Sequence, residues 1–238
     1  IILFGFIGQV AWAVENNFFN TFLFSFGGTT KDISTMVAAS AVVAVVTTFV
    51  MGTLSDKLGR RKVFICAGYV AWGITVMAFA FISRENLGKL LGADPSSAAA
   101  LSATVTTVIV MDCIMTFMGS TSNDSAFNAW ITDVTVPSNR AKTEGLLAIL
   151  PVLALVIVTG VFGFIAGDDA QASDYATCFL GLGILVIICG IVGIFTIKDT
   201  GSGQKSDGNF FADLIYGFRP SVIKSHNCLL YTSDAADE

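Results

Sequence analysis

Two acidic residues lie within long apolar segments, where a carboxylate is costly to bury. Glu15 falls in the apolar run 1–26, and Asp112 falls in the run 100–122. An ionisable group at the centre of a membrane helix costs about 2.5–3.5 kcal/mol, so it is usually retained for function. Because a buried carboxylate can bind Na+ through its oxygen atoms or take up H+, we predict that Glu15 and Asp112 couple a cation. The alternative is that they only bond to polar groups on neighbouring helices.

Polar side chains follow both acids at helical spacing. At about 100° per residue, the first segment has a narrow polar stripe with two flanking residues: Gln9, Trp12, Asn16 and Asn20, flanked by Glu15 and Asn17. In the later segment one face carries Asp112, Thr116, Gly119 and Asn123. Amides, hydroxyls and an indole ring can hydrogen-bond and stack against a sugar-like solute. The predicted substrate-binding residues are Trp12, Asn16, Asn17, Asn20, Thr116 and Asn123, with hydrogen bonds between helices as the alternative role of the asparagines.

The composition points to a lipid environment. Hydrophobic residues make up 54% of the 238 residues and charged residues only 13%, against about 25% charged in a typical soluble domain. A soluble helical protein is the alternative, but a chain this apolar could not cover its surface with polar groups. A helix crosses the bilayer with about 20 mostly apolar residues, and lipid offers no partner for unpaired backbone groups. The sequence therefore predicts an all-α membrane protein with six transmembrane helices, at 1–26, 33–54, 63–82, 100–122, 145–166 and 175–197.

Lysine and arginine residues gather in alternate loops. Ten of the 13 lie between the second and third segments, between the fourth and fifth, and after the sixth. The other loops hold only Lys31, Arg84 and Lys89. Since cytoplasmic loops are enriched in basic residues, we expect a multi-pass protein of the cell membrane with both ends in the cytoplasm.

The predicted domains are a transmembrane bundle at 1–197, a cytoplasmic linker at 198–227 and a tail at 228–238. Apolar residues at helical spacing in the linker predict a short helix on the cytoplasmic membrane face, formed by Phe210, Phe211, Leu214, Ile215 and Phe218. The beginning of a seventh span is the alternative. We expect the tail to be a translated sequencing adaptor, and the first helix to lack its beginning.

Charge and cysteine content narrow the range of partners. The formal net charge of −5 argues against nucleic-acid binding. The five cysteines show no CxxC spacing, and four of them lie in apolar segments. We therefore expect neither disulfides nor a metal site, and no cofactor apart from Na+ or H+ as a coupling ion.

The loop between the second and third segments reads GTLSDKLGRRK at positions 52–62. It matches the pattern G-x-L-[SA]-D-[RK]-x-G-R-[RK], and on this motif the chain resembles the major facilitator superfamily of secondary transporters. The resemblance implies that the chain is the amino-terminal six-helix half of a transporter whose carboxy-terminal half is missing. It also implies a conformational gate on the cytoplasmic face, formed by Gly52, Asp56, Gly59, Arg60 and Arg61.

The chemistry of the motif suggests how the gate is held. Gly52 would let the second helix approach a neighbour closely, and Gly59 would permit a tight turn. Asp56 would accept hydrogen bonds from Arg60 or from a helix amino terminus. We expect the fourth helix to continue beyond the membrane edge, where charged residues either join this network or stay solvated: Asp124, Asp133, Arg140 and Glu144.

Two further stretches, AWAVENN at 11–17 and NDSAFNAWITD at 123–133, resemble glycoside–pentoside–hexuronide cation symporters, the melibiose-permease-like group. The resemblance implies symport of a sugar or glycoside with Na+ or H+ by alternating access. The implied partners are a small-molecule solute, the lipid bilayer and the second six-helix half.

Other functions remain as alternatives. A proton-coupled exporter of drugs or other small solutes is the runner-up, although the fifth segment lacks the G-x-x-x-G-P motif of drug antiporters. Different classes are an intramembrane aspartyl protease and a non-transporting scaffold. The Tyr-Asp and Gly-x-Gly-Asp contexts of such proteases do not occur around Glu15 and Asp112, so we expect no enzymatic activity.

Overall fold

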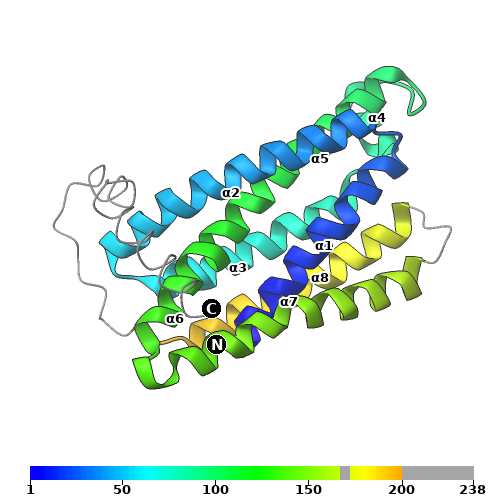
Figure 1. Ribbon diagram of the computed structural model, residues 1–238. Coiled ribbons are helices and arrows are strands. Elements are labelled where there is room, and N and C mark those ends of the chain that lie inside the picture. Colours follow the sequence, from blue (N-terminus) through cyan, green and yellow to red (C-terminus); the bar gives the residue numbers. More distant parts are fainter. Residues whose placement is uncertain (167–171, 200–238) are drawn as a thin grey trace, which may run out of the picture.

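The computed structural model describes residues 1–166 and 172–199, and these residues form helices without any strand (Figure 1). The long helices are α1 (Ile2–Ser25), α2 (Thr30–Leu58), α3 (Arg61–Ala78), α5 (Ala98–Gly119), α7 (Pro137–Ala166) and α8 (Ala172–Thr196). The shorter ones are η1 (Phe79–Phe81), α4 (Arg84–Leu91), η2 (Ser120–Phe127) and α6 (Asn128–Val134). The prediction of an all-α fold is confirmed.

The six long helices lie side by side and alternate in direction, so the beginning of α1 and the end of α8 lie at the same end of the bundle (Figure 1). We call this the Arg61 end, because it also carries the short turn between α2 and α3. The opposite end carries α4 and is called the α4 end. Extensive contacts join α3 to α8, α1 to α7 and α2 to α5.

Small residues allow α3 and α8 to pack closely. A Cβ atom added to Gly73 of α3 would lie 2.6 Å from the carbonyl oxygen of Gly183 on α8. A second close approach brings the Gly190 position of α8 to within 2.9 Å of Val70. Small residues at helix crossings are typical of membrane bundles, where van der Waals packing drives association.

An aromatic cluster fixes the orientation of α1 toward the α4 end. Phe19 of α1 packs against Phe79 of η1 in a tilted arrangement with ring centroids 4.4 Å apart. Phe22 of α1 meets Phe179 of α8 edge to face at 5.0 Å. All four side chains are buried. With this face of α1 fixed against η1 and α8, its polar residues are turned toward α2 and α5.

Five helices in the described part of the chain are long and apolar enough to cross a membrane: Thr30–Leu58, Arg61–Phe81, Ala98–Val134, Pro137–Ile165 and Asp174–Thr196. The 24-residue helix α1 has the length of a span and lies along the others (Figure 1), but it is not among these five. Its polar residues, from Gln9 to Asn20, lower its mean hydropathy. Five of the six predicted spans are therefore long and apolar enough to cross a membrane. The sixth, α1, is the helix that carries the polar stripe.

The turn between α2 and α3 matches one expectation and contradicts another. Gly59 ends α2 in the left-handed conformation, with φ of 61°, so the predicted tight turn at this glycine is confirmed. A Cβ atom at Gly52 would meet nothing within 4 Å among the described residues. The expectation that Gly52 lets α2 approach a neighbour is therefore wrong for this bundle, because that side of α2 faces outward.

Surface helices differ from the prediction as well. The helical segment of α5, η2 and α6 continues to Val134, which confirms the extension past Asn123. An eight-residue helix, α4, lies at the end of the bundle opposite the Arg61 end (Figure 1) and was not predicted. The helix predicted around Phe210 lies outside the described residues.

Candidate functional site

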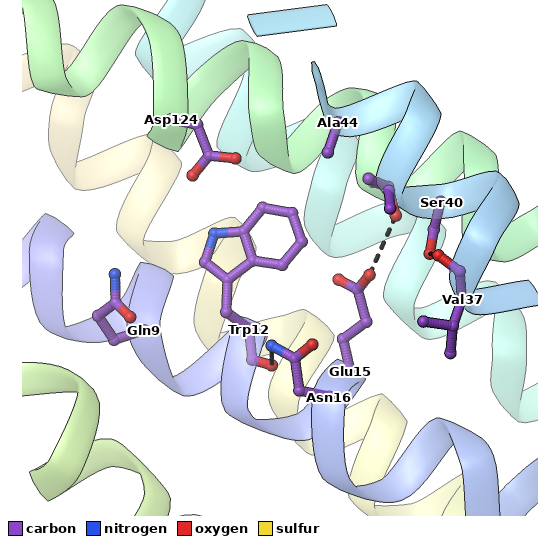
Figure 2. A pocket seen from close by; sticks show the side chains of 10 residues that line it. Gln9, Trp12, Glu15, Asn16, Val37, Ser40, Ala44 and Asp124 are labelled. Carbon is purple, nitrogen blue, oxygen red and sulfur yellow. Dashed lines mark hydrogen bonds between the residues drawn. The ribbon is translucent and has the colours of Figure 1, made fainter. Parts of the chain in front are cut away.

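A polar cavity of about 430 Å³ opens between α1, α2 and the segment formed by α5 and η2 (Figure 2). From α1 it is lined by Gln9, Trp12, Glu15 and Asn16, from α2 by Val37, Ser40, Ala41 and Ala44, and from the third wall by Thr116 and Asp124. The small residues of α2 leave space in front of the polar face of α1. The cavity therefore brings together the two polar stripes that the sequence places on separate helices.

One hydrogen bond connects the two stripes directly. Thr116 Oγ1 donates to Glu15 Oε1 at 3.0 Å, drawn as a dashed line in Figure 2. The other carboxylate oxygen, Glu15 Oε2, is buried and has no hydrogen-bond partner among the described residues. A buried carboxylate oxygen left in this way is energetically unfavourable unless a ligand, a proton or water reaches it.

The indole of Trp12 forms one wall of the cavity. Its ring lies 5.1 Å from that of Trp72 on α3, and its nitrogen points toward Asp124 (Figure 2). This nitrogen is buried and makes no hydrogen bond within the described structure. An indole face backed by a second indole is a suitable surface for stacking against a ring-shaped solute.

Asp112 lies behind the cavity and does not line it. It is only 2% exposed, and its buried Oδ1 atom has no hydrogen-bond partner among the described residues, although Ser40 of α2 lies near its carboxyl group. Its charge acts on Glu15, as does that of Asp124. None of these three carboxyl groups forms an ion pair with a basic side chain in the described ranges, so the region is a concentration of negative charge.

A π-helical segment decides which residue of the third wall faces the cavity. The eight residues Ser120–Phe127 of η2 are π-helical, so their hydrogen bonds run from i to i+5 and each turn takes up about one residue more than in an α-helix. With a continuous α-helix, Asn123 would align with Thr116. The wider turn instead places Asp124 in line with Thr116 and turns Asn123 into the bundle, where it is 3% exposed and donates to Tyr69 Oη at 3.5 Å.

The predicted substrate-binding residues divide into two groups. Trp12, Asn16 and Thr116 line the cavity. Asn17 is exposed and donates to the backbone oxygen of Ala13 at 2.7 Å, and neither it nor Asn20 lines the cavity. Asn17, Asn20 and Asn123 are therefore the predicted substrate-binding residues that do not line the cavity.

Sequence reasoning missed three residues that line the cavity. Gln9 belongs to the predicted stripe but was not assigned a role, and Ser40 lies on α2, where no solute or cation ligand was predicted. Asp124 was expected either to join the cytoplasmic charge network or to stay solvated. For Asp124 a signal was present, since Ser120 and Asp124 are four residues apart and their side chains bond at 2.9 Å. The position of Ser40 opposite Asp112 depends on the packing of α2 against α5, which no local pattern reveals.

The predicted gate residues lie at the Arg61 end, and Arg61 is their centre. The guanidinium of Arg61 forms an ion pair with Asp56, donates to Ser55 Oγ at 2.6 Å and contacts Asp133 Oδ2 of α6 at 3.2 Å. Arg60, expected to bond Asp56, is the exposed residue before α3. The partner of Asp56 is therefore Arg61, because the left-handed turn at Gly59 and the start of α3 direct that side chain back toward α2.

The remaining charged residues of this end have separate roles. Asp133 joins the Arg61 cluster, which was one of the two alternatives expected for it; the other was a solvated position. Arg140 instead donates to the backbone oxygen of Thr132 at 3.0 Å, and Glu144 is exposed. Asp124 is absent from this cluster because it faces the cavity.

Comparison with known proteins identifies the family. A family model described as the Major Facilitator Superfamily matches residues 1–229. Because the match extends over nearly all of the 238 residues, the chain belongs to the Major Facilitator Superfamily, a family of secondary transporters. No curated protein and no solved structure gave a significant match. The family and the apolar helices together make this a multi-pass membrane protein.

Proposed function

We propose that the chain is one half of a secondary active transporter that carries a sugar or glycoside together with a cation by alternating access. The observation that carries the proposal is the cavity in which Glu15 and Thr116 bond across α1 and α5 beside Trp12. Carboxylate, amide and hydroxyl groups suit the hydroxyls of a sugar, and the Trp12 ring suits its apolar face. In this proposal Trp12, Asn16 and Thr116 contact the solute, and Asn17, Asn20 and Asn123 act from outside the cavity wall.

The charge around the cavity favours coupling to a cation. The charges of Asp112 and Asp124 both act on Glu15, and no lysine or arginine lines the cavity in the part of the chain that the structure describes. Carboxyl groups without basic partners inside a membrane need a proton or a bound cation to balance their charge. We assign Glu15 and Asp112 to cation coupling on this ground, with Na+ or H+ as the ion.

The proposal also includes the orientation of the bundle in the membrane and the wall that would close the open side of the cavity. The excess of basic residues in the loops on one side, ten against three, supports an orientation with the Arg61 end on the cytoplasmic side of a cell membrane. Transporters of this architecture bind their solute between two repeats near the membrane midplane, so a second six-helix bundle would cover the open side of the cavity. The Arg61 cluster, with Gly52, Gly59 and Arg60 beside it, would then act as a gate at the contact between the two halves.

Uptake into proteoliposomes tests the proposal. The complete transporter, reconstituted with an imposed Na+ or H+ gradient, is offered a panel of radiolabelled sugars and glycosides. We expect gradient-dependent accumulation of at least one of them, and the loss of accumulation in Glu15→Gln. Gradient-driven extrusion of an amphipathic compound, with no sugar taken up, would support a proton-coupled exporter instead.

A further inference from the structure

A second and smaller polar chamber adjoins the solute cavity. It measures about 70 Å³ and lies between the first half of α1, the η2–α6 junction and α7. Its polar lining consists of Gln9, Asn123, Asp124 and Asn128. A water molecule occupies about 30 Å³ in the liquid, so the chamber has room for one small ion with little accompanying water. It is too small for the solute.

Hydrogen bonds in the chamber leave oxygen atoms available. Asn123 donates its amide hydrogens toward Tyr69 Oη at 3.5 Å, and Asn128 donates to the backbone oxygen of Asp124 at 3.0 Å. One carboxylate oxygen of Asp124 accepts from Ser120 at 2.9 Å. Both amides therefore form these bonds through their nitrogen atoms, and oxygen is the atom that an amide offers to a cation.

The donor set matches one class of ligand. Carboxylate and amide oxygens are hard ligands that suit hard cations. One carboxylate, that of Asp124, lines the chamber, and a monovalent cation neutralises its charge. An anion would be repelled by Asp124.

The wall of the chamber toward the Arg61 end is sealed by apolar contacts. A Cβ atom at Gly5 of α1 would lie 2.7 Å from Leu147 Cδ2 and 3.2 Å from Leu150 Cδ1 on α7. The same position is 3.5 Å from Phe127 Cζ. Glycine at this position lets α1 and α7 approach closely on this side of the chamber.

We propose that this chamber, formed by Gln9, Asn123, Asp124 and Asn128, is a binding site for a single Na+ ion. Gln9 and Asp124 line both the chamber and the solute cavity, so an ion bound there shares its ligands with the cavity wall. The Trp12 indole nitrogen points toward the same carboxylate (Figure 2). The inference deepens the proposed symport by adding a cation site beside Glu15 and Asp112, whose coupling role is unchanged, and only the purpose of this site depends on the proposed function.

Direct binding of radiolabelled Na+ to the purified chain in detergent, without any solute, tests the site. We expect saturable binding that unlabelled Na+ displaces and choline does not. Asp124→Asn removes the only chamber carboxylate and should raise the Kd by about tenfold or more, a change of about 1.4 kcal/mol or more. Glu144→Gln, an equal charge change at an exposed position of α7, should bind Na+ as the unaltered chain does.

A second variant covers the case in which Asp124→Asn fails to fold. Asn128 is exposed, so Asn128→Ala should fold and raise the Kd by a smaller factor, about threefold. The absence of saturable Na+ binding by the unaltered chain, or equal affinity in all three variants, would overturn the site. Because no solute is present, Na+ binding with no sugar transport would reject the proposed function and leave the site standing.

Discussion

Thr116 on α5 donates a hydrogen bond of 3.0 Å to Glu15 on α1, and this bond joins residues that are 101 positions apart in the sequence. It is the direct contact between the two polar stripes, and it sits in the wall of the cavity. Thr116 is 1% exposed, and Glu15 accepts the hydrogen bond that its hydroxyl donates. The pair therefore fixes the distance between the helices that hold the proposed solute.

Removing the hydroxyl of this pair should weaken both folding and solute binding. Thr116→Val keeps the shape of the side chain but leaves Glu15 Oε1 without its donor. We expect a loss of about 1 kcal/mol in the free energy of unfolding, measured by thermal unfolding in detergent, and a higher KM for uptake. Thr116→Ser, which retains the hydroxyl, should recover both. Thr196→Val, at an exposed hydroxyl that bonds only within α8, is the matched control. Equal effects at the two threonines would contradict the role of the pair.

Glu15 should be needed for coupled uptake. Glu15→Gln preserves the size of the side chain and an oxygen that can accept from Thr116, but it removes the charge. We predict that accumulation against a gradient falls by about tenfold or more, while the amount of protein in the membrane stays the same. Glu85→Gln makes the same change on the exposed helix α4, where Glu85 pairs with Lys89 at 2.7 Å, and its uptake should remain within about twofold of the unaltered transporter. If Glu15→Gln concentrates the solute normally, the cation assignment fails.

The two adjacent arginines should behave differently. Arg61 contacts Ser55, Asp56 and Asp133, whereas Arg60 is exposed. Arg61→Gln leaves two carboxylates without their partner and should lower the thermal midpoint by several degrees, which corresponds to about 1–3 kcal/mol. Arg60→Gln should change it little. A larger effect at Arg60 would show that the cluster is arranged differently.

Glycine positions in α1 and α7 provide a test of the packing around the chamber. A Cβ atom at Gly8 would overlap the amide of Asn123 and lie 2.8 Å from Tyr69 Oη. Gly8→Ala should therefore destabilise the bundle by about 1–3 kcal/mol. At Gly145 an added Cβ meets nothing within 4 Å in the described structure, so Gly145→Ala should be neutral or slightly stabilising because alanine favours the helix. Chemical unfolding of the two variants in parallel measures the difference. Similar losses at both glycines would contradict the close approach of α1 to η2.

Local sequence patterns were sufficient to locate the helices. They were insufficient to predict which residues of η2 face the cavity. Long apolar runs located the spans, and Gly59 located the turn before α3. The polar stripe of α1 correctly placed Trp12, Glu15 and Asn16 on a common wall. A fixed angle per residue failed at η2, because a π-helical segment changes the register, and so Asp124 was exchanged for Asn123.

Tertiary packing accounts for the other differences. Ser40 acquires its position only from the approach of α2 to α5, and Arg61 rather than Arg60 reaches Asp56 because of the direction in which α3 begins. Gly52 has the residue type of a close helix contact but no described neighbour within 4 Å of its added Cβ. In each of these cases the residue type indicated a kind of contact, but the sequence did not show which residue would be the partner.

The central claim is that the polar faces of α1 and α5 border an aqueous cavity, and cysteine labelling tests it most directly. In a variant without the native cysteines, Ser40→Cys places a thiol in the cavity wall, and Val46→Cys places one on the outward side of α2, where Val46 is 55% exposed. A charged, membrane-impermeant thiol reagent reacts with thiols that reach water. We predict that Ser40→Cys is labelled in membranes, that the transported solute protects it, and that Val46→Cys is not labelled. An unreactive Ser40→Cys together with a reactive Val46→Cys would contradict the account.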